Sequence, residues 1–487
     1  MKNKLYKLAL LTVFGLCSFS VSSQNTWINT YGTLYSDEGN SVQQTFDGGY
    51  IITGHASPNN PWDSDLYLIK TNSSGDTAWT KTYGGTGNEI GVDVKQTTDN
   101  GFIICGYYSD SGPGGFDVWL LKTNTNGDTL WTKTYGGAFN DYGNSVFQTD
   151  DGGYVIIGST MSFGAGSFDY WILKTNASGD SLWSTTYGGF YNEIAFEAQA
   201  TSDGGYIIAG YKQIQGFINA DVWLLKIYSN GEEEWSQTYG GDYGELAYSV
   251  QETADAGFIV SGYTRSFGSG GDDVYLIKTD MYGDTIWTKT FGGLSNDAGN
   301  SVIETAEGDF IVCGNTFSYS ANGDMDLWLI KTDISGYTLW TETYGGSGAE
   351  LGFSIIEAFD GGLTACGFTS SYGAGNTDVW LLHLDSDGQV GIDQPLSQTS
   401  TNYELYQNYP NPFFNSTTIE YFIPISGLVT LRVYDLSGKI LTTMVDEYQH
   451  VGIHSIRFEN KQLQKGIYYY RLQSGTFDRT KKLIISQ

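Results

Sequence analysis

The chain has 487 residues, enough for more than one domain, and its 65 glycines against 7 prolines indicate a turn-dense β protein rather than a disordered one. From Glu404 onward, 9 basic and 7 acidic residues nearly cancel. Before that point, once the three lysines near the N-terminus are set aside, 12 basic and 47 acidic residues leave a balance of −35. Such a surface argues against binding to nucleic acid or anionic lipid, and it favours solubility outside the cell or binding of cations.

Residues 1–23 have the pattern of a secretory signal peptide. Lys2, Lys4 and Lys7 form a basic end, an apolar run follows, and small residues close the segment. We therefore expect cleavage after Ser23. No other stretch is long and apolar enough for a transmembrane helix, so we expect none in the mature chain.

Seven copies of one motif, a tryptophan followed by an aromatic residue and glycine, organise residues 24–395. The tryptophans recur at steps of 52, 52, 52, 52, 52 and 53 residues, and they are Trp27, Trp79, Trp131, Trp183, Trp235, Trp287 and Trp340. A fixed period of this size indicates stacked or radially arranged supersecondary units.

The repeat that runs from 88 to 137 contains four predicted short strands, separated by turns rich in Gly, Asn and Asp. Four antiparallel strands in about 50 residues match one blade of a β-propeller. Trp27 occupies a fourth-strand position, whereas the repeats end at 378–382 in a third-strand position. The N-terminal strand is therefore free to complete the last blade. This predicts an all-β, closed seven-bladed β-propeller, with an open β-solenoid as the alternative.

Two acidic positions recur in every repeat, on the side of the blade that carries the longer loops. The position after Tyr-Gly-Gly holds Asp37, Glu89, Asp141, Glu193, Glu245, Asp297 and Glu350. The position that begins the third strand holds Asp65, Asp117, Asp169, Asp221, Asp273, Asp326 and Asp378. We interpret these carboxylates as acceptors of backbone N–H bonds at turns. The alternative is that the first set forms a ring of oxygen ligands for Ca²⁺; no other cofactor is predicted.

Ligand binding is expected on the longer loops, which vary most between repeats. Trp62 lies in such a loop, and it is the only one of the 13 tryptophans outside a repeated strand position. The loops of other repeats carry Phe163, Phe217, Phe267, Tyr319 and Tyr372. We predict that these rings form a surface for stacking on sugars. The alternative for Trp62 is that it folds back and covers the first blade.

Constellations for catalysis are scarce in the repeats. Cys105, Cys313 and Cys366 share one strand position and are predicted to be buried, reduced thiols. Only His55 and His383 fall in the repeats, and His383 occupies a position that is lysine elsewhere. Activation of a nucleophile by histidine therefore has little basis. Paired carboxylates remain an alternative route to hydrolysis.

A polar linker is predicted at 396–403, and the pattern changes at 404–487 to short alternating strands, typical of a small Ig-like β-sandwich. The motifs of this segment are Pro410-Asn411-Pro412-Phe413, Tyr434-Asp435 with Gly438, Gly466 with Tyr468, and Lys481-Lys482. In this order they resemble the type A C-terminal sorting domain of the type IX secretion system of Bacteroidetes. One departure is Phe414-Asn415-Ser416, where the family usually has a further proline.

The resemblance implies transport across the outer membrane by the type IX machinery, removal of the domain by its sorting peptidase, and release or attachment at the cell surface. The repeats resemble the Asp-Gly-Gly-Tyr propeller repeats often joined to this domain. We expect a secreted or cell-surface protein whose propeller is a non-catalytic binding or adhesion module for carbohydrate or another extracellular polymer. The alternatives are a glucanase-like hydrolase that uses carboxylates at the channel mouth, and a purely structural surface protein.

Overall fold

A computed structural model describes residues 26–57, 64–85, 87–109, 115–215, 219–320, 322–390, 404–405, 408, 411–423, 427–436, 438–449, 452–460, 463–474 and 477–486. Within these ranges every regular element is a β-strand. The expected signal peptide and linker lie outside the described residues, as do Trp62, Phe217 and Pro410. In the described part of the chain, no helix is long and apolar enough to cross a membrane.

Seven four-stranded sheets follow one another along the chain, and we number them as blades 1 to 7. Blade 1 contains β2 (Asp37–Gln44), β3 (Tyr50–Ala56), β4 (Asp65–Thr71) and β5 (Thr77–Tyr83); blade 2 contains β6 (Glu89–Gln96), β7 (Phe102–Tyr108), β8 (Asp117–Thr123) and β9 (Thr129–Tyr135). Blade 3 contains β10 (Asp141–Gln148), β11 (Tyr154–Thr160), β12 (Asp169–Thr175) and β13 (Ser181–Tyr187); blade 4 contains β14 (Glu193–Ala200), β15 (Tyr206–Gln215), β16 (Asn219–Ile227) and β17 (Glu233–Tyr239).

Blade 5 contains β18 (Glu245–Glu252), β19 (Phe258–Thr264), β20 (Asp273–Thr279) and β21 (Thr285–Phe291); blade 6 contains β22 (Asp297–Glu304), β23 (Phe310–Thr316), β24 (Asp326–Thr332) and β25 (Thr338–Tyr344). Blade 7 contains β26 (Glu350–Glu357), β27 (Leu363–Thr369), β28 (Asp378–Leu384) and β1 (Trp27–Tyr31). The predicted series of four-stranded β units is therefore confirmed, and the arrangement is propeller-like.

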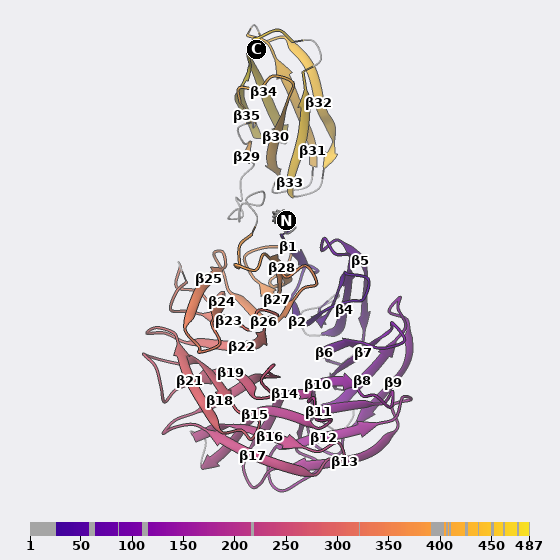
Figure 1. Cartoon of the computed structure of the whole chain (residues 1–487). Coiled ribbons are helices and arrows are strands. Elements are labelled where there is room, and N and C mark those ends of the chain that lie inside the picture. Colours follow the sequence, from indigo (N-terminus) through magenta and orange to yellow (C-terminus); the bar gives the residue numbers. More distant parts are fainter. Residues whose placement is uncertain are drawn as a thin grey trace, which may run out of the picture.

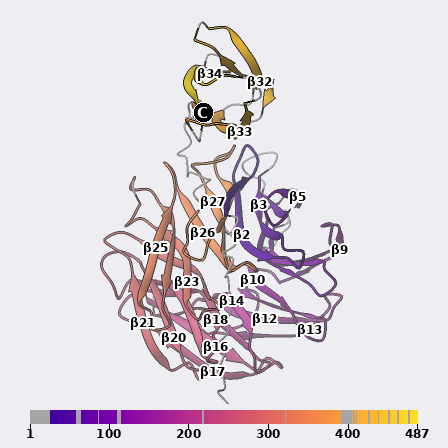
Figure 2. The same cartoon turned by 45° about the horizontal axis from the view of Figure 1, so that its top comes forward.

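The blades are arranged radially, with the first strand of each blade towards the centre (Figure 1). The view in Figure 2 shows the same sheets from a second direction. β1 pairs antiparallel with β28, so that Trp27 lies opposite His383. Blades 1 and 7 also contact each other, because Val42 N donates to Ser354 Oγ at 3.3 Å and Phe359 N donates to Gln44 Oε1 at 2.7 Å.

Each blade buries its middle strands, and the fourth strands of blades 1 to 6 are largely exposed. The third strand of blade 3, Asp169–Thr175, is buried at every position, whereas the fourth strand of blade 2, Thr129–Tyr135, alternates between exposed and half-buried residues. Apolar residues of neighbouring blades pack together, as where Tyr170 of blade 3 meets Trp223 of blade 4 at a ring-centroid distance of 4.5 Å. Burial of such a side chain contributes about 2–3 kcal/mol, so each blade depends on its neighbours.

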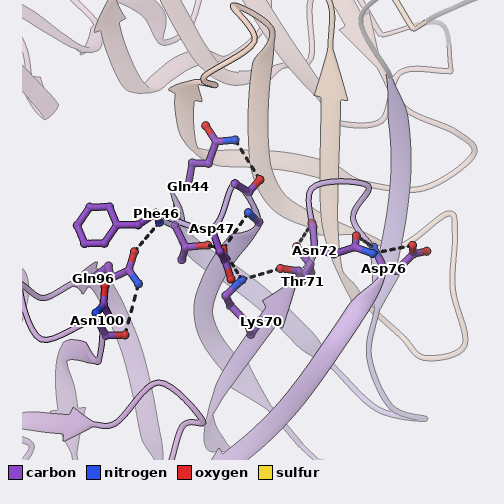
Figure 3. Close-up of polar contacts among 12 residues, drawn as sticks. Gln44, Phe46, Asp47, Lys70, Thr71, Asn72, Asp76, Gln96 and Asn100 are labelled. Atoms are coloured by element: carbon purple, nitrogen blue, oxygen red, sulfur yellow. Dashed lines mark hydrogen bonds and ion pairs between the residues drawn. The ribbon is translucent and has the colours of Figure 1, made fainter.

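A buried cation at the end of the third strand pairs with the turn between strands one and two. In blade 1, Lys70 Nζ donates to Asp47 Oδ1 at 3.1 Å and to Thr71 O at 2.8 Å (Figure 3). The same turn is tied to blade 2, because Phe46 N donates to Gln96 Oε1 at 2.8 Å. In blade 7 the lysine is replaced by His383, whose Nε2 lies 3.1 Å from Asp360 Oδ2. The prediction that His383 is a strand residue in a lysine position is thus confirmed.

The C-terminal segment folds into two further sheets. One contains β29 (Glu404–Leu405), β30 (Ser416–Ile423) and β33 (Gly452–Glu459); the other contains β31 (Gly427–Tyr434), β32 (Ile440–Gln449), β34 (Gly466–Ser474) and β35 (Phe477–Ile485). Ile419 and Tyr421 of the first sheet share one buried core with Leu431 and Tyr470 of the second. The two sheets therefore pack face to face around a common apolar core.

The sequence motifs of this segment hold these sheets together. Phe413 is buried, its N donates to Ile484 O at 3.0 Å, and Asn411 Oδ1 accepts from Ile484 N at 2.9 Å. Asp435 and Gly438 form the turn between β31 and β32, where Gly438 has a φ of 84°. Gly466 and Tyr468 lie at the start of β34, and Lys481 and Lys482 lie on β35. The motif residues that the structure describes are thus parts of one folded domain.

Candidate functional site

Positions that depart from the repeat mark where the seven blades differ in chemistry. Of the 12 basic residues in the repeats, nine serve repeated roles on third and fourth strands: they are Lys70, Lys81, Lys122, Lys133, Lys174, Lys226, Lys278, Lys289 and Lys331. The other three, Lys95, Lys212 and Arg265, stand on first and second strands or the loop beyond them. Since the fold repeats without them, these three residues indicate sites that belong to individual blades.

Two pockets open beside Arg265 on the long-loop face. One, of about 240 Å³, lies between blades 4 and 5 and is lined by Asn192, Tyr211, Gln213, Asn219, Ala220, Gly244, Leu246, Tyr263 and Arg265. The other, of about 440 Å³, is lined by Tyr243, Arg265, Gly270, Gly271, Asp272 and Asn296. Arg265 borders both, and it is held by Asp272, whose Oδ1 lies 2.5 Å from its Nε. The guanidinium carbon also lies 5.4 Å from the centre of the Tyr263 ring.

Exposed apolar side chains occur in the loops between consecutive blades. They follow the fourth-strand aromatic residue and its glycine, where the sequence differs most from blade to blade, and they are Leu34, Phe139, Phe190, Tyr191, Tyr243 and Leu294. Tyr243, which lines the larger pocket, is 56% exposed. The repeat pattern of the sequence does not single out these residues. The available signal was the presence of large apolar residues at a turn that holds Gly, Ala or Ser in other blades.

The four predicted ligand aromatics that the structure describes are only partly exposed, because each packs on its own blade. Phe163 lies 5.3 Å from Trp171, Phe267 lies 5.6 Å from Tyr275, and Tyr319 lies 5.1 Å from Trp328, measured between ring centres. Tyr372 lies 5.8 Å from Trp380 and donates to Gly345 O at 2.9 Å. These four rings thus cover strand aromatics while keeping part of their surface on the long-loop face, beside the newly identified apolar residues.

The seven acids after Tyr-Gly-Gly are buried, and each accepts a hydrogen bond from the backbone of its own loop. Glu245 is representative: its Oε2 accepts from Gly241 N at 2.8 Å, and its Oε1 accepts from Thr264 Oγ1 at 2.8 Å. Backbone N–H donors four residues earlier are present for all seven, which are Asp37, Glu89, Asp141, Glu193, Glu245, Asp297 and Glu350. These bonds use oxygen lone pairs that a cation would require. Among the described residues, no group of three or more His, Cys, Asp or Glu is placed to hold a metal ion.

Each of these acids meets the aspartate that begins the third strand of the preceding blade. A Cβ added at Gly84 would lie 1.9 Å from Asp65 Oδ1 and 2.3 Å from Glu89 Oε2, so glycine is required between the two carboxylates. Burial, together with the charge of Asp141, raises the pKa of Asp117 in the corresponding pair. The two sets of acids that the sequence singled out are therefore brought together in pairs at the junctions between blades.

A third distinctive cluster lies among the first strands of the blades. A cavity of about 350 Å³ is bordered by Asp93, Lys95 and Glu197, and Lys95 Nζ lies 2.9 Å from Asp93 Oδ1. Burial lowers the pKa of Lys95, but the charges of Asp93 and Glu197 outweigh this and raise it overall. Burial also raises the pKa of Glu197, despite hydrogen bonds to Ser249 and Val250 N. Lys95 therefore stays charged between carboxylates of blades 2 and 4.

The cysteine and histidine side chains of the described repeats are poorly placed to act as a nucleophile or a base. Cys105, Cys313 and Cys366 are buried and unbridged, as predicted, and burial raises the pKa of each thiol. Burial lowers the pKa of His55 to about 4, so its imidazole is neutral at pH 7. His383 hydrogen-bonds Thr364 at 2.8 Å inside blade 7. These contacts favour packing roles over activation of a nucleophile.

Over 228 residues the chain is 24% identical to regulatory protein FlaEY of Caulobacter vibrioides, a match that covers 42% of this chain and 24% of FlaEY. The structure of PorZ of Porphyromonas gingivalis, a surface component of the type IX secretion system, has a TM-score of 0.41 at 9% identity, covering 93% of this chain and 59% of PorZ. A puromycin hydrolase structure has a TM-score of 0.49 at 10% identity, covering 80% of this chain and 59% of that chain.

The chain thus spans about a quarter of FlaEY and three fifths of the two solved chains. In the C-terminal segment, residues 407–486 match the family model of the secretion system C-terminal sorting domain. The match contains the motif residues that pack Phe413 against β35 and form the Asp435–Gly438 turn. The C-terminal domain therefore belongs to the secretion system C-terminal sorting domain family, and it identifies the chain as a secreted, cell-surface protein handled by the type IX secretion system.

Proposed function

We propose that the repeats form a closed seven-bladed β-propeller that acts as a non-catalytic binding module for extracellular carbohydrate, through the long-loop face of blades 4 to 6. The observation that carries the proposal is the pair of pockets that share Arg265, with Tyr243 exposed at their edge. Closure is supported by the pairing of β1 with β28 and by the hydrogen bonds between blades 1 and 7.

The chemistry of this face suits a sugar polymer. An exposed aromatic ring offers an apolar plane for stacking on a sugar, and planar polar groups beside it fix the hydroxyl groups by hydrogen bonds. The pockets combine Tyr243 and Tyr211 with the planar side chains of Asn192, Arg265 and Asn296. Phe163, Phe267, Tyr319 and Tyr372 extend the same face, and we propose that Trp62 and Phe217 belong to it as well.

A hydrolase is the second candidate, because carboxylates lie in pairs at the junctions between blades. Glycoside hydrolysis requires two carboxyl groups that flank the bond to be cleaved and reach the substrate. In blades 5 to 7 the members of these pairs are almost completely buried, and their oxygens accept hydrogen bonds from loop N–H and hydroxyl groups; examples are Glu245, Asp273 and Glu350. This favours binding over hydrolysis.

A glycan-array screen of the full mature chain tests the proposal, followed by titration of the best ligand. Tyr243→Ala and Arg265→Gln are expected to weaken binding at least about tenfold each, since stacking and charged hydrogen bonds both act in this range. Tyr282→Ala is the matched control, because Tyr282 is an exposed tyrosine in a tight turn on the opposite face of blade 5.

Unchanged binding in both variants would contradict the location of the site. Hydrolysis of the bound polymer by the wild-type chain would contradict the non-catalytic part of the proposal. Trp62→Ala is expected to weaken binding with little change in melting temperature, whereas a mainly destabilised variant would favour a covering role for Trp62.

A further inference from the structure

The axial channel carries one position that repeats in every blade. A β-bulge in the first strand brings it to the channel wall, where the residues are Ser41, Asp93, Ser145, Glu197, Ser249, Ser301 and Ser354. In three of the serine blades its structural role is to accept an N–H from the next blade: Ser249 Oγ accepts from Val302 N at 3.1 Å, Ser301 Oγ from Ile355 N at 3.3 Å, and Ser354 Oγ from Val42 N at 3.3 Å. A serine is therefore sufficient to join neighbouring blades.

Two blades place a carboxylate where the others have serine. Asp93 Oδ2 accepts from Val146 N at 3.0 Å, and Glu197 Oε2 accepts from Val250 N at 3.0 Å, so both still perform the structural role. The second carboxylate oxygen and the negative charge are additional. Because partly buried charges cost folding free energy, and five serines do without them, these two carboxylates indicate a function beyond the fold.

The surroundings of the two carboxylates form a cavity rather than a packed core. About 350 Å³ is available, and aromatic side chains contribute to its wall. Phe196 and Tyr248 meet edge to face at a ring-centroid distance of 5.0 Å, next to Glu197 in the chain and on the neighbouring blade. Lys95 lies in the same cavity with 36% of its side chain still accessible to solvent, and it is paired with Asp93.

We propose that the axial channel binds a small organic cation, an alkylammonium group, between Glu197 and the rings of Phe196 and Tyr248. This site is distinct from the long-loop face and does not depend on the carbohydrate proposal. Carboxylates combined with aromatic faces are the groups that recognise ammonium ions, through charge and cation–π attraction. Lys95 is the internal counter-ion, which pairs with Asp93 and leaves one negative charge uncompensated in the cavity.

The class of ligand follows from the balance of donors and acceptors. Asn40, Asn144 and Asn300 also line the cavity, and each donates an amide hydrogen to a carbonyl of the next blade, at 2.8, 2.6 and 2.8 Å. With these amide hydrogens engaged, the ionised groups of the wall are two carboxylates and one lysine, which suits an ammonium group with its N–H donors. The balance of −35 over the repeats also attracts cations towards the channel.

Isothermal titration of the full mature chain with n-butylammonium tests the proposal, with n-butanol as the neutral compound of similar shape. The ammonium is expected to bind and the alcohol is not. Glu197→Ser, which installs the residue of five other blades, is expected to weaken binding at least about tenfold. Lys95→Gln, which installs the residue found at Gln43, Gln199 and Gln251, is expected to tighten binding by about three- to tenfold, because it removes the internal competitor.

Asp150→Ser is the control, since it removes one exposed negative charge on the tight-turn face, where blade 4 has Ser202. It is expected to leave the affinity unchanged. Phe196→Asn provides a second test, since blades 1, 3 and 6 have asparagine at that position, and weaker binding is expected. Equal binding of the alcohol, unchanged affinity in both Glu197→Ser and Phe196→Asn, or weaker binding in Lys95→Gln would overturn the proposal.

Discussion

Lys174 Nζ lies 2.9 Å from Asp151 Oδ1, and this pair fastens the third strand of blade 3 to the turn between its first two strands. The lysine is buried, whereas the aspartate is 57% exposed. Hydrogen bonds from Thr149, Lys174 and Gly153 N lower the pKa of Asp151 from 3.8 to about 2. The same arrangement occurs in blade 1 at Lys70 and Asp47 (Figure 3).

Asp151→Asn is expected to reduce the free energy of unfolding at pH 7 by about 1 kcal/mol, a value discounted for the exposure of the carboxylate. The folded-state pKa is depressed, so the stabilisation is present above pH 3.8 and is lost as the pH falls towards 2. Urea unfolding of both proteins between pH 2 and 7 measures this, and the difference should shrink below pH 4. The neighbouring Asp150→Asn is the control, expected within about 0.5 kcal/mol of wild type. A difference independent of pH would contradict the assigned cause.

Gly84→Ala is expected to destabilise the protein by about 1–3 kcal/mol, the usual cost of overpacking. The added Cβ would lie 1.9 Å from Asp65 Oδ1 and 2.3 Å from Glu89 Oε2, at the junction of blades 1 and 2. Gly85→Ala is the matched control, because a Cβ there meets nothing within 4 Å. Thermal unfolding compares the two variants; equal melting temperatures would show that the junction does not require glycine.

The three thiols of the repeats are expected to resist modification in the native protein. Cys105, Cys313 and Cys366 are buried and unbridged, and burial raises the pKa of each, so little thiolate forms at pH 8. Titration with an aromatic disulfide reagent should detect few thiols before denaturation of the mature chain and three after it. A bridge between Cys313 and Cys366, found by mass spectrometry without reduction, would contradict this expectation.

A chain that ends at Gln394 is expected to fold but to remain in the periplasm of a host with type IX secretion. Residues 407–486 supply the sorting domain, and each blade packs against neighbouring blades of the repeats. Fractionation with immunoblotting measures the location, and far-UV circular dichroism of the purified chain measures folding. Normal levels of the truncated chain outside the cell would mean that export does not depend on the sorting domain.

The fold could be predicted because its determinants are periodic. The tryptophan steps, the alternation of each first strand and the Gly/Asn/Asp turns recur in register with the sheets. The position of Trp27 also predicted that β1 would join the last blade, and β1 does pair with β28. The pairing of the first and last strands of the repeats could therefore be predicted from residue spacing alone.

The candidate site was harder to predict from the sequence, because its residues are exceptions to the repeat. Arg265 and Tyr243 lie on loops, where no periodicity fixes the direction of a side chain, and only the structure places them beside common pockets. The sequence identified Phe163 as an exposed ring, but it could not show that the ring packs on Trp171. Asp93 and Glu197 lie in strands that otherwise follow the repeat pattern, so periodicity does not single them out. The sequence does show that five other blades have serine at the same position.

The pairing of β1 with β28 joins the first and last strands of the repeats, and this sets an order of events during synthesis and export. The earliest strand to emerge must wait for a partner that emerges after every other blade. Joining strands so distant in sequence is entropically costly and slow, so the seam between blades 7 and 1 is expected to assemble last. We therefore expect β1 to stay unpaired until β28, the last strand of the repeats, has been synthesised.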